Sequence, residues 1–126
     1  MKTSFTHKYI VDMNLTISDD RVSVQTQFSD NISEELKTEL KELAYEQADK
    51  FSNSYFLKIL KKEDAQISIS LVMEKTEPEH KFNGKFNVNL DGNSFHWSND
   101  VPFSMPRDIV MHAFKHLKNH LSDLQD

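Results

Sequence analysis

The stretch Ser104–Gln125, SMPRDIVMHAFKHLKNHLSDLQ, decides the architecture that the rest of the chain must complete. Its apolar residues recur at steps of three and four, which is typical of a helix with one face packed on a core. Ser104 can cap the start of this helix, and Pro106 suits its first turn, where a missing N–H costs nothing. The predicted apolar stripe comprises Ile109, Val110, Ala113, Phe114, Leu117, Leu121 and Leu124.

The remaining surface of this predicted helix is polar, with lysines that are positively charged and histidines that can become so. It carries His112, Lys115, His116, Lys118, Asn119 and His120. We expect a sheet to hold the helix in place while this polar side meets a partner.

Length and composition indicate one small domain. A chain of 126 residues can bury one core, and we expect residues 9–126 to form it after a flexible tail at residues 1–8. The absence of cysteine excludes disulfides, thiolate zinc sites and cysteine nucleophiles. No apolar run reaches the roughly 18 residues of a membrane helix, and the N-terminus lacks a signal-peptide core. We therefore expect a soluble, cytoplasmic protein with no membrane partner.

The charge is unevenly distributed along the chain. The net charge of −5 speaks against diffuse attraction to nucleic acid. Acidic residues concentrate in Glu34–Glu46 and Glu74–Glu79, whereas the region from Lys81 to Leu121 is mildly basic. Charged histidines would make that region more basic below about pH 6.5.

The N-terminal part of the predicted domain reads as a hairpin. Alternating apolar residues run from Tyr9 to Ile17 and again from Val22 to Phe28, which indicates two half-buried strands. Asp19-Asp20 between them is a plausible turn.

A long helix follows. Asn31 or Ser33 can open it, and Asn31 with Glu34 resembles a capping box. Its expected apolar stripe is Leu36, Leu40, Leu43, Ala44, Ala48 and Phe51. Near Ser52–Ser54 the helix either continues or kinks, and the pattern does not decide between the two.

Three strands precede the closing helix. Apolar residues alternate in Ile67–Met73 and Phe82–Leu90, separated by the break at Glu77–Glu79. Asp91-Gly92 is a strong hairpin-turn signal and leads to a short strand with Phe95 and Trp97 facing the core. The sequence therefore predicts an α+β fold: an antiparallel sheet, mixed at one edge, of four to five strands with two helices on one face. The order is β-α-β-β-β-α with an extra N-terminal strand.

The opposite face of this sheet is expected to be polar, rich in amides and hydroxyls and nearly free of carboxylates. It comprises Ser68, Ser70, Lys81, Asn83, Lys85, Asn87, Asn89, Ser94, His96 and Ser98. Lys81 and Lys85 can contact phosphates, with Asn83 between them able to meet base or sugar edges. A solvated strand that uses lysine to stay soluble explains the same residues.

His112, His116 and His120 recur every four residues and stand in a row on one helix face. Two of them can chelate zinc or nickel, but no further ligand is assignable, so we expect no metal. A solvated histidine face and contact with RNA remain open. No serine elbow, His-Glu-x-x-His motif or phosphate loop is present, which predicts a non-enzymatic protein without a cofactor.

From Val22 onward the order of elements resembles the ribosome hibernation-promoting factors, the ribosome-associated translation inhibitors. The resemblance rests on Ile32–Lys37, Ala65–Leu71, the pair around Asp91-Gly92 and the apolar spacing of the closing helix. It covers about four fifths of the chain. The element order also looks like a double-stranded RNA-binding domain, although that domain's lysine cluster at the last helix is missing.

The resemblance implies a factor that binds the small ribosomal subunit through ribosomal RNA and inhibits translation or preserves idle ribosomes, without a small-molecule substrate. The candidate RNA-binding residues are Lys37, Lys81, Asn83, Lys85, Arg107, His112, Lys115, His116, Lys118, Asn119 and His120. Members of the family carry several Lys and Arg along the closing helix, where this chain has His112, His116, Asn119, His120 and Asp123. With the net charge of −5, this favours an alternative: an acidic protein–protein interaction module that has lost RNA binding.

Overall fold

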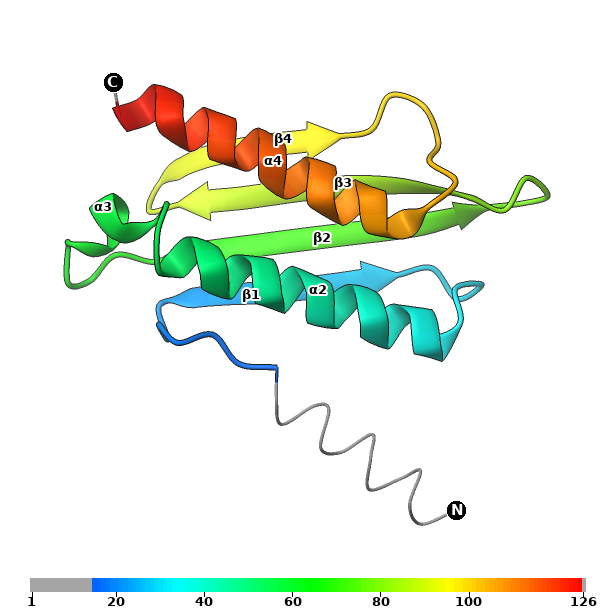
Figure 1. Cartoon of the computed structure of the whole chain (residues 1–126), viewed down its shortest axis with the longest axis horizontal. Coiled ribbons are helices and arrows are strands. Elements are labelled where there is room, and N and C mark those ends of the chain that lie inside the picture. The colour runs from blue at the N-terminus through cyan, green and yellow to red at the C-terminus, as the bar shows by residue number, and fades with distance from the viewer. Residues whose placement is uncertain (1–14, 126) are drawn as a thin grey trace, which may run out of the picture.

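A computed structural model of the chain describes residues 15–125, with side chains placed up to residue 123. Two long helices lie on one face of a four-stranded sheet, and no element formed by residues 15–125 covers the other face, which we call the uncovered sheet face (Figure 1). The elements in chain order are β1 (Val22–Phe28), α2 (Glu34–Ser52), α3 (Leu57–Leu60), β2 (Ile67–Thr76), β3 (Lys81–Leu90), β4 (Asn93–Ser98) and α4 (Pro106–Gln125).

The strands lie in the order β1-β2-β3-β4, and β1 runs parallel to β2 while the other neighbours are antiparallel. The parallel pair follows from α2, which carries the chain back across the sheet between the two strands. Asp91 and Gly92 join β3 to β4 with φ angles of +53° and +103°, the backbone that a two-residue hairpin needs. The predicted α+β class, with its mixed edge and both helices on one face, is confirmed.

The predicted N-terminal strand is not found where it can be examined. Leu15, Thr16 and Ile17 belong to no strand, and the rest of that prediction, like the expected tail at residues 1–8, lies outside the described residues. The turn at Asp19 is confirmed, because the Val22 N–H donates to the Asp19 carbonyl over 3.2 Å.

Helix α2 begins with Ser33 as its cap, since the Ser33 hydroxyl accepts from the Leu36 N–H at 3.2 Å. Asn31 is not the cap; its amide donates to the Lys75 carbonyl at 2.9 Å. The helix ends at Ser52, where the Ser54 hydroxyl and the Asn53 amide donate to carbonyls of the last turn. These bonds settle the choice left open by the sequence: α2 stops, and α3 is a separate short helix.

Helix α4 begins at Pro106, two residues later than Ser104, the predicted cap. Pro106 is the first helical residue, as expected from its missing N–H. Six residues of the predicted stripe are at most 2% exposed, whereas the side chain of Leu124 lies outside the described part. These six are Ile109, Val110, Ala113, Phe114, Leu117 and Leu121.

Helix α4 approaches the sheet closely at Gly84 in β3. A β-carbon at position 84 would lie 2.5 Å from the Cγ2 of Ile109, so only glycine leaves room for Ile109 at this helix–sheet distance. Phe114 then packs against Phe51 of α2 and Phe86 of β3, with ring centroids 5.2 and 4.9 Å apart. These contacts fix both helices on the sheet and so orient their outer surfaces.

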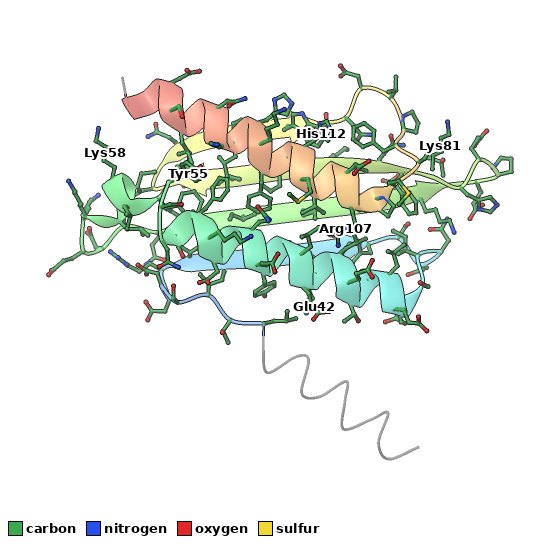
Figure 2. All side chains as sticks on the ribbon, viewed as in Figure 1. Glu42, Tyr55, Lys58, Lys81, Arg107 and His112 are labelled. Carbon is green, nitrogen blue, oxygen red and sulfur yellow. The ribbon has the colours of Figure 1, made fainter. Side chains whose placement is uncertain are left out.

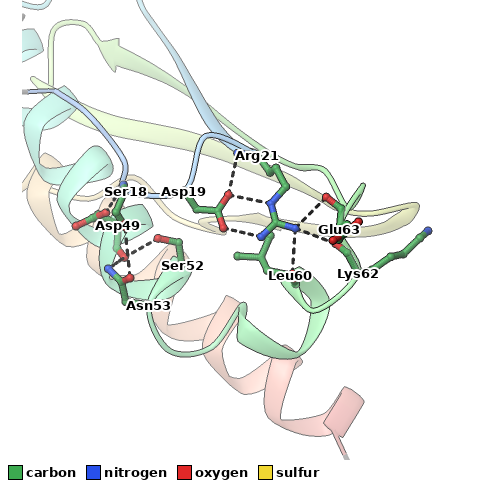
Figure 3. Close-up of polar contacts among 9 residues, drawn as sticks. All are labelled: Ser18, Asp19, Arg21, Asp49, Ser52, Asn53, Leu60, Lys62 and Glu63. Atoms are coloured by element: carbon green, nitrogen blue, oxygen red, sulfur yellow. Dashed lines mark hydrogen bonds and ion pairs between the residues drawn. The ribbon is translucent and has the colours of Figure 1, made fainter.

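Arg21 ties the segment after α3 to the start of β1 (Figure 3). Its guanidinium donates to both carboxylate oxygens of Asp19 and to the carbonyls of Leu60, Lys62 and Glu63, at 2.8–3.1 Å. One planar group thus satisfies backbone acceptors at the end of a short helix. Within residues 15–125, no helix combines the length and the apolar character that crossing a bilayer requires.

Candidate nucleic-acid interface

The candidate residues predicted from the sequence lie on both sides of the sheet rather than on one. Lys81, Asn83 and Lys85 belong to the pattern of β3 that points away from the helices. The candidates of α4 lie on the helical side of the sheet, as Figure 2 shows for Arg107 and His112, and Lys37 belongs to α2. The structure therefore offers two separate surfaces.

The first surface is the uncovered sheet face. Strand register places Gln25, Ser70, Asn87 and His96 in one row across the four strands. A shallow depression of ≈ 340 Å³ lies over this part of the sheet. The charged residues of this face are Glu74 and Lys81, toward one end of β2 and β3, and Lys85 at the middle of β3. A face of hydroxyls and amides can donate and accept hydrogen bonds, but it supplies little charge for phosphates.

The histidines of α4 do not project freely, because each packs against an aromatic ring at the β4 edge. Ring centroids are 5.3 Å apart for His112 and Phe103, 5.6 Å for His116 and Trp97, and 5.0 Å for His120 and Phe95. The three histidines therefore cover aromatic rings of β4 and of the loop that follows it. Among the described residues, no group of three or more His, Cys, Asp or Glu is placed to hold a metal ion.

The second surface is a groove between α2 and α4, opening away from the sheet. Buried Phe51 and Phe114 contribute apolar surface, and the groove has a volume of ≈ 420 Å³. The Nζ of Lys118 lies 5.4 Å from the centroid of the Tyr55 ring, within cation–π range. We call this surface the basic groove; it is lined by Gln47, Lys50, Phe51, Tyr55, Met111, Phe114, Lys115 and Lys118.

Three lysines of the basic groove come from two helices, and only Lys115 and Lys118 were predicted. Lys50 and Tyr55 were missed because they belong to the end of α2 and the turn after it, more than fifty residues before α4 in the chain. A lysine at the expected end of the first long helix was the one available signal for Lys50, and its charge complements the helix dipole there. None of the ion pairs found among the described residues involves Lys50, Lys115 or Lys118.

The solvent-facing stripe of α2 has the opposite charge. Four exposed carboxylates at spacings of four, three and four form what we call the acidic ridge: Glu35, Glu39, Glu42 and Glu46. Lys37 lies on a different side of α2 and is paired with Glu34 at 3.0 Å, so its charge is partly offset. Arg107, in the first turn of α4, lies between the two helices in Figure 2.

Perturbed titrations occur away from both surfaces. The Arg21 side chain and N–H hold the pKa of Asp19 below its usual range. The Gln66 N–H and the Lys62 ammonium do the same to the pKa of Asp91. Both carboxylates anchor turns, where their hydrogen bonds stabilise the backbone.

Comparison of the sequence with protein-family models gives no match, and comparison with curated proteins gives none either. Solved structures do match the fold. The N-terminal domain of Protein Y from Thermus thermophilus is 9% identical, with a TM-score of 0.50 over 86% of this chain and 98% of that domain. A ribosomal subunit interface protein from Coxiella burnetii is 17% identical, with a TM-score of 0.52 over 82% of this chain and 97% of its own. At these identities, the likeness establishes a shared fold.

Proposed function

We propose that this protein is a ribosome-associated factor that binds RNA of the small ribosomal subunit in the cytoplasm and inhibits translation or preserves idle ribosomes. The shared fold supports the proposal, since one of the two similar structures is described as a ribosomal subunit interface protein. The protein acts in this proposal by occupying an RNA-lined site through shape and charge, without catalysis.

The observation that carries the proposal is the convergence of Lys50, Lys115 and Lys118 around Tyr55 in the basic groove. Ammonium groups without an intramolecular carboxylate partner are available to phosphates, whose neutralisation releases counterions and supplies affinity. The partly exposed ring of Tyr55 offers a surface on which an unpaired base can stack. Lysine and tyrosine together suit a ribose-phosphate backbone with exposed bases.

The direct test is co-sedimentation of the protein with purified small ribosomal subunits at low and at moderate salt. We expect the wild type to pellet with the subunits at low salt and less so at moderate salt. A variant with Lys115→Ala and Lys118→Ala should lose most of this binding. The matched control, Lys81→Ala with Lys85→Ala, removes the same charge from the uncovered sheet face and should bind nearly as the wild type does. A wild type that pellets at neither salt concentration contradicts the proposal.

The acidic ridge favours a second function, an acidic protein–protein interaction module on the same fold. Four exposed carboxylates along α2 repel phosphates, and they suit a partner protein with a basic surface. Pull-down with the wild type would recover one protein partner whether or not nuclease is present, and Glu42→Lys would weaken its recovery. Loss of the partner after nuclease treatment would instead favour binding through RNA.

A further inference from the structure

The acidic ridge and the basic groove follow each other along the outer surface of the two helices. Helices α2 and α4 run in the same direction across the sheet (Figure 1). The ridge occupies the first part of α2, and the groove lies where α2 ends beside the middle of α4. With about 1.5 Å of rise per residue, the middle of the ridge and the last turn of α2 are roughly 16 Å apart.

That separation leaves both surfaces available to a partner. At their nearest point the two patches lie within the Debye length of about 8 Å, because Glu46 precedes Lys50 by one helical turn. Glu35, Glu39 and Glu42 are about 12 Å or more from Lys50 along the helix axis, so their charges are little neutralised by the groove. Met111 lines the groove and is 42% exposed. The helical surface therefore carries a row of carboxylates along α2, a group of lysines where α2 ends beside α4, and the exposed side chain of Met111. Arg107 lies between the helices near the start of α4 (Figure 2).

We propose that two copies of this chain associate through their helical surfaces, with the acidic ridge of each copy on the basic groove of the other. A two-fold axis that crosses α2 and α4 near Met111 turns the second copy end for end and brings opposite charges together at both ends. Such a contact is isologous and closes at two copies. The Met111 side chains then meet near the axis, where apolar contact is expected in an interface.

The association should be weak and dependent on salt. Its charges are at the surface, and screening reduces their attraction as the ionic strength rises. The partner copy would cover Lys115 and Lys118, so association and RNA binding would exclude each other; this consequence alone rests on the proposed function.

Sedimentation velocity of the full chain at about 0.02 M and about 0.3 M salt tests the proposal. We expect dimers at low salt and mostly monomers at high salt. The ridge-reversed variant, Glu42→Lys with Glu46→Lys, and the groove-reversed variant, Lys115→Glu with Lys118→Glu, should each raise the dimer dissociation constant more than about tenfold. A control with Glu74→Lys and Lys85→Glu reverses two charges on the uncovered sheet face and should dimerise as the wild type does.

Mixing the two reversed variants is the decisive experiment. In a mixed dimer, the new lysines on the ridge of the first variant meet the new glutamates in the groove of the second. At the other contact, the unchanged ridge of the second variant meets the unchanged groove of the first. The mixture should therefore form dimers that neither variant forms alone. Circular dichroism of each variant establishes that it is folded. A wild type that is monomeric at low salt, variants that dimerise unchanged, or a mixture that stays monomeric would each overturn the proposal.

The ridge-reversed variant also separates this proposal from the RNA-binding one, because it keeps every lysine of the basic groove. It should fail to dimerise and still bind small subunits at least as well as the wild type. If it dimerises normally but does not bind subunits, self-association through the ridge is wrong.

Discussion

The imidazole of His116 is stacked on the indole of Trp97, with ring centroids 5.6 Å apart and an interplanar angle of 21°. The contact joins α4 to β4, the edge strand of the sheet. It is the middle one of three histidine–aromatic pairs on α4; His120 is tilted against Phe95, and His112 meets Phe103 edge to face. The histidines therefore belong to the packing between the closing helix and the sheet edge as well as to the surface.

We call the three histidine–aromatic contacts between α4 and the sheet edge the histidine seam. Replacing Trp97 with alanine should destabilise the fold, because it removes the largest ring of this seam and the stacking partner of His116. We expect a loss of about 2 kcal/mol in the free energy of unfolding, less than for a fully buried tryptophan, since Trp97 is half-buried. Urea denaturation followed by far-UV circular dichroism measures the change. Ser98→Ala, on the same strand but facing away from α4, should stay within about 0.5 kcal/mol of the wild type. Equal effects of the two substitutions would argue against the seam.

Replacing Gly84 with alanine tests how tightly α4 sits on β3. The added methyl group would lie 2.5 Å from Ile109 Cγ2, and both residues are buried, so the Ile109 side chain or the helix must shift. We expect a loss of about 1–3 kcal/mol in the free energy of unfolding. In a double-mutant cycle with Ile109→Ala, the double variant should lose less than the sum of the single variants, because the new methyl group partly fills the space left by isoleucine. Strict additivity would contradict the close approach.

Much of this architecture is predictable because it depends on local patterns. The stripe from Ile109 to Leu121 and the turn at Asp91-Gly92 are determined by spacing and by backbone preferences, and both are found as expected. The alternation from Tyr9 to Ile17 is equally regular, yet Leu15–Ile17 form no strand, since a strand also needs a neighbour to pair with. The side chains that end α2 at Ser52 act through individual hydrogen bonds, which periodicity does not encode.

The candidate interface was less predictable, because it is made by packing between distant segments. Lys50, Tyr55 and Lys118 meet only after Phe51 and Phe114 have set the distance between the two helices. Conversely, the even spacing of His112, His116 and His120 was correct, but their aromatic partners on β4 and in the following loop could not be assigned without the register of the sheet. Helical spacing shows which residues share one face of a helix, but it does not show which neighbouring element that face contacts.

The stability of the protein should fall in acid partly through Asp19. Hydrogen bonds from the Arg21 side chain and N–H lower the pKa of Asp19 in the folded state below its value in the unfolded chain. Its contribution is therefore fully present above the unfolded pKa, about 3.9, and is lost as the pH falls through the lower folded pKa. Asp19→Asn should be less stable than the wild type at neutral pH, and the difference should shrink as the pH falls below about 4.

Urea midpoints of the two proteins at pH values on either side of 4 measure this difference. Asp91, whose pKa is also lowered, contributes equally to both proteins, so the difference isolates Asp19. Asp30→Asn serves as the control, because Asp30 is exposed and takes part in none of the ion pairs found among the described residues. It should shift the midpoint little at either pH. A gap between wild type and Asp19→Asn that stays constant into acid would show that the Arg21 contact does not act through the charge of Asp19.

The salt dependence of binding can distinguish the basic groove from the uncovered sheet face. Each lysine that neutralises a phosphate contributes about 0.7–0.9 to the slope of log Kobs against log salt concentration. Replacing Lys50, Lys115 and Lys118 with glutamine should therefore lower the magnitude of that slope by about 2, along with the affinity for small subunits. Lys81→Gln with Lys85→Gln should leave the slope nearly unchanged, because those lysines lie on the strand face that points away from the groove. The reverse result, with the slope dependent on Lys81 and Lys85, would move the RNA contact to the hydroxyl- and amide-rich face of the sheet and leave the basic groove to the second copy of the chain.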